Sequence, residues 1–392
     1  MSNEPLSVLL FGATGTVGGF TAAALAGMPG VRVRAAVRPV SHANLSRLEN
    51  MGVEIVRADL GDPDSLDAAF EGIDHAFLVN SLFSLDDMAE QTRNFIEAAK
   101  RAGVKRIVRS GGAPFPKCEM GDLHEAAQEM FIESGIPYVL VRPNFFDTNL
   151  LWSAGTIKEK GSFYLPLGDA RIAWTDPQDI GAVVAHAFTA PDVEGRTFHV
   201  TGPEAIKTSA VAGHLAEAIR AAKRDRNELM QKGFDRLDSN RDGFVTRNEL
   251  EEHLVGFGFS GEEISGFLKS ADTDGDGRIS VEEYRDDVRR AADARLDGPD
   301  ADIAYIAVDD ETASREMTML GVPPRAIELL VGLYGLIRTG GAEPLGNGVE
   351  EALGRPAGSV REWADRHVAA FIPTHWEALR QNDLELRPSS VG

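Results

Sequence analysis

From Ser7 onward, short apolar segments alternate with stretches in which apolar residues recur at helical spacing. Strands that alternate with helices predict right-handed crossovers and a parallel sheet covered on both faces. The predicted strands read SVLLFG, VRVRAAVR, VEIVRADL, HAFLVNS, KRIVRSGG, IPYVLVRP and RTFHVTGP, and the predicted helices cover residues 17–28, 45–51, 65–70, 85–102, 123–134 and 208–222. The pattern therefore predicts the α/β fold class, with a doubly wound parallel sheet.

Near Lys223 the pattern changes, because strand-like segments stop and charged helices flank two loops rich in Asp and Gly. The strand-like segment ADIAYIAVD begins at Ala301, and helices broken by Gly and Pro follow it. We interpret residues 1–222 as the α/β domain with part of a substrate lobe. Residues 223–300 are interpreted as an inserted all-α domain, and residues 301–392 as the return of the first fold with the rest of a small substrate lobe and a tail.

The chain has 392 residues, 61 acidic against 40 basic side chains, a formal net charge of −21 and 43% hydrophobic residues. That apolar content excludes a wholly disordered chain, and no apolar run approaches the roughly 20 residues of a membrane-spanning helix. Without such a run a membrane is not an expected partner, and because an acidic chain repels nucleic-acid phosphates, neither is a nucleic acid. The N-terminal residues lack the pattern of an export signal, and the single cysteine, Cys118, closes no intrachain disulfide, so we expect a cytoplasmic protein.

The first predicted strand ends in a glycine-rich loop, and an apolar helix follows at once. Small residues at this spacing allow a tight turn and let backbone N–H groups approach a pyrophosphate at the positive end of a helix. The loop predicts a dinucleotide-binding Rossmann domain, and the alternative is a glycine turn that only packs helix on strand. The expected cofactor-binding residues of the loop are Gly12, Thr14, Gly15, Thr16, Val17 and Gly18.

The end of the second predicted strand distinguishes the two nicotinamide dinucleotides. An acidic residue there binds the ribose 2′-hydroxyl of NAD, whereas an arginine suits the 2′-phosphate of NADP. The strand ends in Arg38 without a carboxylate, which favours NADP(H) over NAD(H), with a solvated surface charge as the alternative. Asp59 and Leu60 after the third strand and Asn80 after the fourth are expected to line the cofactor, and Asp59 equally suits a turn or a helix cap.

The insertion carries two copies of an acidic loop with amphipathic flanks. Calcium takes about six to eight oxygen ligands, which an EF-hand loop supplies from positions 1, 3, 5, 7, 9 and 12 with a glycine at position 6. Every position fits in both copies, which predicts an EF-hand pair that binds two Ca²⁺ ions. The predicted ligands are Asp238, Asn240, Asp242, Phe244 through its carbonyl, Thr246 and Glu249 in loop 1, and Asp272, Asp274, Asp276, Arg278 through its carbonyl, Ser280 and Glu283 in loop 2.

Two further features of the insertion concern its affinity and role. Loop 2 has four carboxylates and loop 1 has three, because Asn240 is neutral, so we predict tighter calcium binding at loop 2. Met230 is the only methionine of the insertion, so the Met-rich groove of broad calcium sensors is absent. This favours a role in which calcium orders the lobe. The alternative is that the EF-hand pair recruits a protein partner.

Five segments of the chain resemble one family: the GATGTVGG loop, ADLGDPDSLDAAFEGID, KRIVRSGG, SGIPYVLVRPNFF and TDPQDIGAVVAHAF. They are similar to the NmrA-like branch of the atypical short-chain dehydrogenases/reductases, over about residues 5–222 and again over residues 301–371. The resemblance implies an NAD(P)-binding Rossmann fold. Its members include quinone reductases, benzylic-ether and isoflavone-type reductases, and redox-sensing regulators that bind the nucleotide without turning it over.

The sequence lacks the Tyr-x-x-x-Lys pair of ordinary short-chain enzymes on the helix after the fifth strand. Counting back from Ile136 places His124 where the resemblance to ether reductases implies a catalytic lysine. A histidine titrates near neutrality, so His124 is expected to act as a proton donor, with a structural hydrogen-bonding residue as the alternative. Ser110, at the end of the fifth strand, is expected to hydrogen-bond a carbonyl group or the nicotinamide amide, with a plain turn residue as the alternative.

The segment after the sixth predicted strand is expected, by the same resemblance, to form a pocket wall beside the nicotinamide. It contains Pro143, Asn144 and Phe145, and an aromatic residue here suits either core packing or an aromatic substrate. Lys117 and Tyr164 are weaker candidates for lining the site. Asp176 and Asp179 fit loop and N-cap positions, and we assign them no chemistry.

These observations predict a calcium-binding, NADPH-dependent oxidoreductase that reduces a quinone or another conjugated, aromatic carbonyl compound. Hydride transfer from the nicotinamide with proton transfer assisted by His124 is the expected chemistry, on a small-molecule substrate. The missing Tyr-x-x-x-Lys pair motivates one alternative, a non-catalytic NADP(H)- and calcium-sensing regulator. A natural-product tailoring enzyme that performs reduction or cyclisation is the other.

Overall fold

The structure is a computed structural model in which the chain forms two compact units. Unit 1 comprises residues 1–149, 165–208 and 307–360, and unit 2 comprises residues 150–164, 209–306 and 361–392. The structure describes residues 4–38, 45–81, 84–113, 118–224, 226–254, 260–292 and 302–372, without the side chains of 223, 224, 226–229 and 288–292. None of the described helices is both long and apolar enough to cross a membrane.

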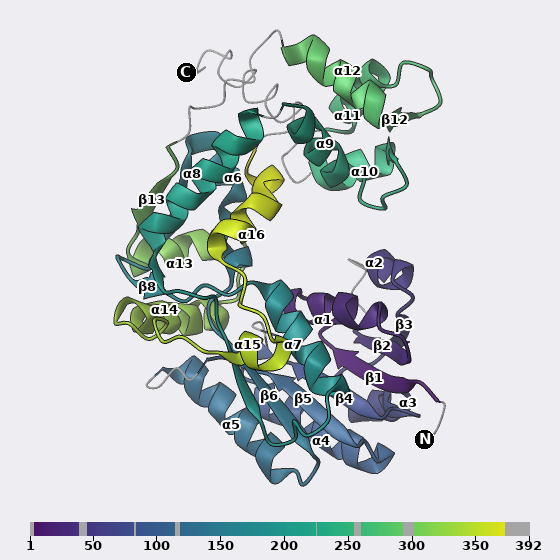
Figure 1. Cartoon of the computed structure of the whole chain (residues 1–392), viewed down its shortest axis with the longest axis vertical. Coiled ribbons are helices and arrows are strands. Elements are labelled where there is room, and N and C mark those ends of the chain that lie inside the picture. The colour runs from purple at the N-terminus through teal and green to yellow at the C-terminus, as the bar shows by residue number, and fades with distance from the viewer. Residues whose placement is uncertain are drawn as a thin grey trace. The chain divides into compact units, whose positions relative to one another are not determined.

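Unit 1 is built on a seven-stranded parallel sheet (Figure 1). The sheet has the strand order β3-β2-β1-β4-β5-β6-β9, so the chain reverses its direction of growth at β1. Ligands of open α/β sheets bind outside the carboxyl ends of the strands at such a switch point. The sheet confirms the predicted doubly wound α/β fold. Its strands are β1 (Leu6–Phe11), β2 (Val31–Val37), β3 (Glu54–Arg57), β4 (His75–Val79), β5 (Arg106–Ser110), β6 (Tyr138–Pro143) and β9 (Thr197–Val200).

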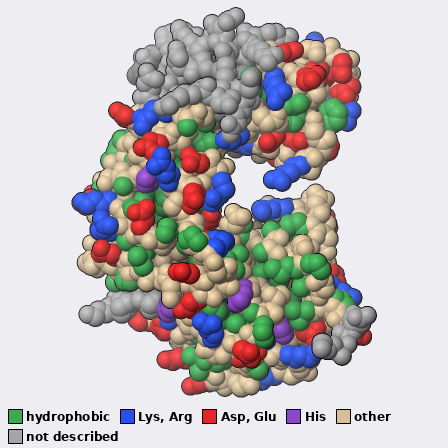
Figure 2. Space-filling view, in the orientation of Figure 1, with side chains coloured by type: hydrophobic (Ala, Val, Ile, Leu, Met, Phe, Trp, Pro, Cys, Tyr) green, Lys and Arg blue, Asp and Glu red, His purple; other side chains and the backbone are tan. Residues whose placement is uncertain are grey.

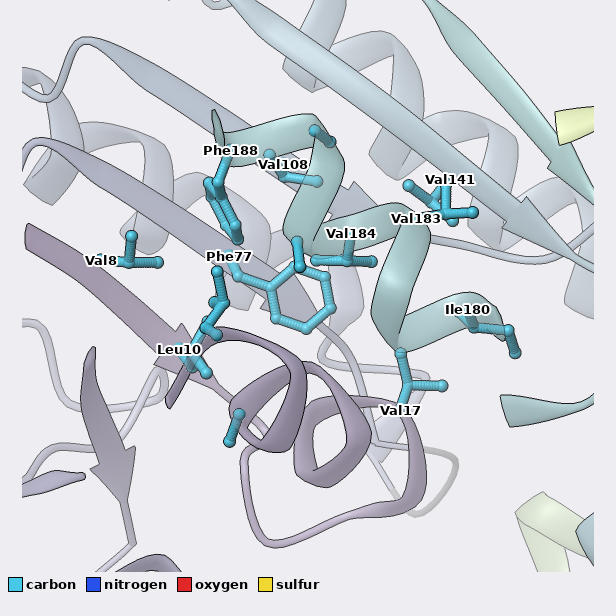
Figure 3. Packing of buried hydrophobic residues seen from close by; sticks show 14 of the residues in the cluster. Val8, Leu10, Val17, Phe77, Val108, Val141, Ile180, Val183, Val184 and Phe188 are labelled. Carbon is cyan, nitrogen blue, oxygen red and sulfur yellow. The ribbon is translucent and has the colours of Figure 1, made fainter. Parts of the chain in front are cut away.

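Helices cover both faces of this sheet (Figure 1). One face packs against α1 (Thr16–Ala26) and α7 (Pro177–Thr189), and the other packs against α3 (Leu66–Phe70), α4 (Met88–Ala102) and α5 (Glu119–Glu133). Successive strand residues point to opposite faces, so β1 contributes Val8 and Leu10 to the first core and Leu9 and Phe11 to the second. Figure 3 shows the first core, in which Phe77 of β4 and Phe188 of α7 lie among the valines of the sheet.

A glycine allows α7 to pack directly against α1. A Cβ atom at Gly181 would lie 2.5 Å from the carbonyl carbon of Phe20, so any side chain there forces the two backbones apart. We expect Gly181→Ala to lower the free energy of unfolding by about 1–3 kcal/mol, as measured by denaturant titration.

The matched control for this prediction is Gly213→Ala in α8 (Thr208–Arg224). No described atom lies within 4 Å of a Cβ at Gly213, so this substitution should raise the free energy of unfolding by about 0.5–1 kcal/mol through helix propensity alone. Equal effects of the two substitutions would refute the close-packing argument.

The rest of unit 1 includes three later helices. Arg325 of α14 bonds to Asp86 at 2.9 Å and also to Glu119 of α5, so the start of α14 lies beside the start of α5. Arg338 at the other end of α14 bonds to Asp310 at 2.7 Å. These elements are α2 (Leu45–Asn50), the 3₁₀ helices η1 (Pro63–Ser65) and η3 (Asp147–Ser153, which runs into unit 2), the antiparallel pair β8 (Arg171–Ile172) and β10 (Ile206–Lys207), α13 (Asp310–Met319), α14 (Pro324–Arg338) and α15 (Gly348–Leu353).

Unit 2 contains the predicted EF-hand pair, which buries an apolar core of its own. That core includes Phe234, Leu250, Ile264 and Tyr284. Arg236 of α9 donates to the carbonyl of Ala369 at 2.9 Å, which joins the pair to the 3₁₀ helix η5. The elements of unit 2 are α6 (Ala154–Lys160), the paired strands β7 (Ser162–Leu165) and β13 (Ala304–Ala307), α8, α9 (Arg226–Leu237), β11 (Phe244–Thr246), α10 (Arg247–Leu254), α11 (Gly261–Ala271), β12 (Arg278–Ser280), α12 (Val281–Ala292), α16 (Val360–His367) and η5 (Val368–Phe371).

The predicted elements exist, and their boundaries differ for local reasons. Helix α5 begins at Glu119, before the predicted start, because the Cys118 sulfur caps the helix by accepting from Gly121 N–H at 3.4 Å. Helix α4 begins later than predicted, at Met88. The division into three domains at residues 222 and 300 stays a prediction.

Candidate cofactor and calcium sites

The glycine loop between β1 and α1 is a cradle without room for side chains. Gly12 has φ +80°, and a Cβ atom there would lie 2.6 Å from Cγ1 of Val79. A Cβ at Gly18 would lie 2.2 Å from the carbonyl oxygen of Gly12. Gly15 is the N-cap of α1, and Thr16 is its exposed first residue, so the free N–H groups of the first turn face the loop.

The other two predicted loop residues differ in exposure. Thr14 keeps part of its surface open to solvent, whereas the side chain of Val17 is buried in the core between α1 and the sheet. Only the backbone of Val17 therefore faces the loop. The loop as a whole has the shape and the donors that a pyrophosphate requires.

Two buried polar side chains lie at the ends of neighbouring strands beside this loop. Ser110 ends β5 and is paired with Val79, the last residue of β4, and Asn80 follows Val79. Neither the amide of Asn80 nor the hydroxyl of Ser110 has a hydrogen-bond partner among the described residues. Because buried polar groups are satisfied in stable proteins, these two side chains fit a polar ligand such as a nicotinamide ribose or amide.

The carboxyl ends of β2 and β3 bring two arginines together. Arg38 is exposed, and its carbonyl accepts from Nη1 of Arg57 at 3.0 Å. Sequence reasoning missed Arg57, because the pairing of β2 with β3 decides which residue lies beside Arg38. Two guanidinium groups at this position suit the 2′-phosphate of NADP.

Asp59 and Leu60 form the turn after β3. The Asp59 carboxylate accepts from Gly61 N–H at 2.9 Å, and its backbone N–H donates to the hydroxyl of Ser65 at 2.9 Å. Leu60 is held by its carbonyl, which accepts from the amide of Asn94 at 2.8 Å. The turn interpretation of Asp59 therefore agrees with its contacts, and contact of either residue with a cofactor stays a prediction.

His124 lies on α5 against the glycines that follow β5. Nη2 of Arg109 donates to Nδ1 of His124 at 3.2 Å, and a Cβ at Gly112 would lie 3.3 Å from the imidazole ring. Arg109 is only 1% exposed, and its Nη2 also contacts the sulfur of Met88 at 3.5 Å. The imidazole thus lies between a buried guanidinium group and the backbone that follows Ser110.

The charges around His124 determine its protonation. Burial, together with the positive charges of Arg109 and Arg142, lowers the pKa of His124 to about 3. Burial and the charge of Arg142 also lower the pKa of Arg109, to about 10, so Arg109 stays protonated at neutral pH. A neutral imidazole is favoured beside two guanidinium groups, which argues against titration of His124 near neutrality. Its catalytic role stays a prediction.

A second buried arginine completes this cluster. Arg142 of β6 forms an ion pair with Glu125 of α5, and its Nε donates to the carbonyl of Gly112 at 3.0 Å. Gln128 donates to the other carboxylate oxygen of Glu125 at 3.2 Å. Two guanidinium groups and one carboxylate leave one net positive charge beside the neutral His124.

The segment after β6 is tied into the fold. Pro143 ends β6 opposite Val200 of β9. The amide of Asn144 donates to the carbonyl of Ala342 at 3.0 Å and accepts from Phe145 N–H at 2.8 Å, so both ends of this side chain are engaged.

The ring of Phe145 packs in the core. Its centroid lies 5.1 Å from the ring centroid of Trp174 and 6.5 Å from that of Tyr334, and Phe145 is 8% exposed. The structure thus agrees with core packing, and contact with an aromatic substrate stays a prediction.

The remaining residues that the sequence singled out lie in different parts of the chain. Tyr164 lies on β7 in unit 2, and Lys117 lies outside the described residues. Asp176 is the N-cap of α7 and accepts from Gln178 N–H at 2.9 Å. Asp176 thus has the predicted N-cap role. Asp179 lies in the first turn of α7 and not in a loop, where it accepts from Arg355 at 2.6 Å and from Gly358 N–H at 2.7 Å.

The two acidic loops of unit 2 have the geometry of EF-hands. Val245 and Ile279 pair in the short antiparallel ribbon β11-β12 that couples the loops. Oxygen atoms of Asp272, Asp274 and Asp276 lie within 4.8 Å of one another, as the ligands of one ion must. Acidic side chains gather over the part of the pair visible in Figure 2.

Backbone N–H groups orient the predicted calcium ligands toward the loop interior. Asp238 accepts from Gly243 N–H, and Asp272 accepts from Gly277 N–H, each at 2.9 Å. Glu283 accepts from Thr273 N–H at 2.7 Å and from Ser280 N–H at 3.0 Å. Burial of Glu283 opposes its charge, but these hydrogen bonds outweigh burial and lower its pKa to about 2.

Loop 1 is arranged in the same way around its remaining predicted ligands. Thr246 N–H donates to Glu249 at 2.9 Å, and Asp242 N–H donates to the side chain of Asn240 at 2.8 Å. Phe244, at position 7, lies opposite Ser280 in the ribbon.

Arg278, at position 7 of loop 2, binds both loops. Its guanidinium bonds to the carboxylate of Asp276 at 2.9 Å and lies 4.0 Å from the ring centroid of Phe244. This cation offsets part of the extra charge of loop 2, so the order of affinities of the two loops stays a prediction.

Together, fold and sites define a dinucleotide-binding Rossmann protein that carries an EF-hand pair. The sequence profile of the NmrA-like family matches residues 6–212, more than half of the chain, and the chain belongs to this family. The profile of the EF-hand domain pair matches residues 226–289. Both matches confirm the resemblance and the motif that the sequence presented.

Two relatives have names that describe an activity. The chain is 38% identical over 216 residues to an NAD(P)H azoreductase of Xenophilus azovorans, a match that covers 54% of this chain and 73% of that protein. It is 30% identical over 213 residues to quinone oxidoreductase 2 of Escherichia coli (strain K12), with the same coverage of each chain.

Solved structures share the fold. The NADPH complex of an NADPH-dependent quinone oxidoreductase from Escherichia coli has a TM-score of 0.61 at 20% identity, over 92% of this chain and 99% of that one. The NADP(H) complex of a triphenylmethane reductase from Citrobacter sp. has a TM-score of 0.62 at 18% identity, over 93% and 100%. At these identities the likeness concerns the fold alone.

Proposed function

We propose that the protein is an NADPH-dependent reductase that transfers hydride to a quinone, an azo compound or another conjugated aromatic acceptor, and that its EF-hand pair binds two Ca²⁺ ions. Membership of the NmrA-like family and the identity with an NAD(P)H azoreductase and a quinone oxidoreductase support the first part. At the level of class, these relatives confirm the prediction of an NAD(P)H-dependent reductase. The acceptor, the preference for NADPH and the calcium ions are proposals.

One observation carries the proposed cofactor site: a glycine cradle beside two buried polar groups without partners among the described residues. Gly12 and Gly18 allow the tight turn that presents the backbone N–H groups at the start of α1 to a pyrophosphate, and Asn80 and Ser110 offer hydrogen bonds at the ends of β4 and β5. When bound there, NADPH supplies a hydride. Ser110 and Asn80 would orient the nicotinamide end, and Arg38 with Arg57 would hold the 2′-phosphate.

The proposed acceptors share one chemical property. A quinone and an azo group each gain negative charge, on oxygen or on nitrogen, when hydride adds to them. The cluster of Arg109, Arg142 and Glu125 beside His124 has one net positive charge, which favours such a developing anion.

The test is oxidation of NADPH by the purified protein with a panel of quinones, aromatic enones and azo compounds, in calcium and in chelator. Turnover that falls with His124→Gln would support the proposed reductase. NADPH that binds without being oxidised by any acceptor would favour the non-catalytic sensor, which the absence of a Tyr-x-x-x-Lys pair on α5 motivates.

The two arginines at the ends of β2 and β3 provide a prediction about cofactor choice. Arg38→Ala and Arg57→Ala should each weaken NADPH binding by about tenfold and leave NADH binding unchanged, because each removes a cation from the 2′-phosphate. Titrations of the two dinucleotides measure this. Arg32→Ala is the matched control, since Arg32 is an exposed arginine at the other end of β2. Equal losses for NADPH and NADH would contradict the assignment.

A further inference from the structure

Arg109 is a charged residue inside a strand whose neighbours are buried on both faces of the sheet. Ile107 packs in the core under α3, α4 and α5, and Val108 packs in the core under α1 and α7. Arg109 points to the α5 face and is 1% exposed. Its Nη2 donates a hydrogen bond to Nδ1 of His124 at 3.2 Å. Burying a guanidinium group is costly, so a position like this calls for a role.

The geometry around Arg109 is built to hold the guanidinium in place. A Cβ atom at Gly111 would lie 2.3 Å from Nη1 of Arg109, so only glycine lets the backbone pass over this group. The sulfur of Met88 accepts from Nη2 on the α4 side at 3.5 Å. The guanidinium has little freedom to turn away from His124.

The hydrogen bond from Arg109 settles which nitrogen of His124 has the proton. A guanidinium group only donates, so Nδ1 must be unprotonated, and the neutral imidazole has its proton on Nε2. Within the described part of the chain, Nε2 makes no hydrogen bond, and the side chain keeps part of its surface open to solvent. A donor is therefore left pointing away from Arg109.

We propose that Arg109 is a positioning residue that fixes His124 as the Nε2–H tautomer, so that this N–H hydrogen-bonds the anion formed on the acceptor during reduction. The inference rests on the proposed reductase function. The acceptor gains a hydride and one negative charge, water supplies the proton that completes the two-electron reduction, and the nicotinamide is oxidised. His124 keeps its Nε2 proton throughout and acts as a donor, with the Arg109 charge behind it.

Charged groups on the sheet, on α5 and on α14 agree with this assignment. On the sheet, Arg109 and Arg142 both oppose a second proton on His124. On α5 itself, Glu125 is engaged by Arg142, and on α14 Arg325 is engaged by Glu119 in the first turn of α5. The Glu125 carboxylate is thus committed to Arg142, and Arg109 remains the partner of the imidazole.

The first arm of the test observes the tautomer directly in the whole protein. Long-range ¹H–¹⁵N NMR of protein labelled in histidine, with His124 assigned by its loss in His124→Gln, should show a protonated Nε2 and a bare Nδ1. The signals should stay unchanged between about pH 5 and pH 8. A protonated Nδ1, or an imidazolium in this range, would overturn the proposal whether or not the protein turns over NADPH.

The second arm removes the charge with a side chain of similar length. In Arg109→Met, loss of a neighbouring cation raises the pKa of His124, so the imidazole should become protonated at a higher pH than in the unsubstituted protein. Turnover of the acceptor at neutral pH should fall by about tenfold with the KM for NADPH unchanged. It should partly recover as the pH falls, because an imidazolium replaces the lost positive charge.

Two variants separate positioning from folding. Arg109→Lys keeps a cation and a donor and should restore part of the turnover. Arg106→Met removes another buried arginine of β5, which bonds the carbonyl of Ala187 at 2.9 Å, and should lower stability while leaving the His124 signals unchanged. An Arg109→Met protein whose His124 spectrum and pH profile are unaltered would overturn the inference. If the unsubstituted protein shows the expected His124 spectrum but neither it nor any variant reduces an acceptor, the proposed function is overturned instead.

Discussion

Gly18→Ala should weaken NADPH binding by about a hundredfold, because the new methyl group would clash with the backbone of the phosphate-binding loop and distort it. A Cβ atom at Gly18 would lie 2.2 Å from the oxygen and 2.5 Å from the carbon of the Gly12 carbonyl, and 2.8 Å from the nitrogen of Ala13. All three are backbone atoms, so the loop must change course to make room. The N–H groups at the start of α1 then lose their common direction. Fluorescence or calorimetric titration with NADPH measures the effect.

The neighbouring glycine gives the control for this experiment. A Cβ atom at Gly19 would lie 3.5 Å from the carbonyl oxygen of Ala13, an ordinary van der Waals contact. Gly19→Ala should therefore bind NADPH as the unsubstituted protein does. A thermal melt of both variants separates loss of the cradle from loss of the fold, and normal NADPH binding by folded Gly18→Ala would refute the cradle.

Glu283→Gln should weaken calcium binding at loop 2 by about a hundredfold, the second large effect that we expect. The Glu283 carboxylate already receives N–H groups from Thr273 and Ser280, at opposite ends of the loop. Both of its oxygens are therefore set to close the ligand shell opposite the three aspartates of the loop. An amide offers only one oxygen and no charge, so the bidentate contact is lost. Calcium titration by calorimetry measures the change.

Glu282→Gln is the matched control, because it removes the same charge from an exposed neighbour that no ligand position uses. It should change the affinity by less than about twofold. Glu249→Gln makes the same change in loop 1. If loop 2 binds calcium more tightly, as predicted, the Glu249→Gln protein should keep a higher calcium affinity than the Glu283→Gln protein. Equal losses from Glu282→Gln and Glu283→Gln would show that net charge, not the ligand shell, governs binding.

Much of the fold and of the cofactor loop was predictable because the relevant physics is local. The alternation of apolar segments predicted the parallel sheet and its helices, and the glycine spacing predicted the turn before α1. The EF-hand pair was predictable down to the pairing of Val245 with Ile279, because each loop contains its whole ligand set. Boundaries such as the start of α5 were less accurate, since a cysteine cap gives a weak signal.

Three arginines of the candidate site were missed from the sequence. Arg57 lies beside Arg38 only because β2 and β3 pair, and Arg109 and Arg142 meet α5 only because β5 and β6 are adjacent under that helix. A signal for the last two was present: a charged residue in a strand predicted to be buried on both faces needs a partner. The partner itself is not readable from strand periodicity.

The sequence by itself determined the Rossmann loop and the calcium loops, because each is a short segment whose backbone turn and ligands are consecutive in the chain. Only the tertiary structure decided the state of His124. Its pKa depends on burial and on guanidinium groups from two strands, and these charges come close to the imidazole only when α5 packs on the sheet. Register along the chain placed a histidine at this position, and the fold placed two guanidinium groups beside it, which favour the neutral imidazole.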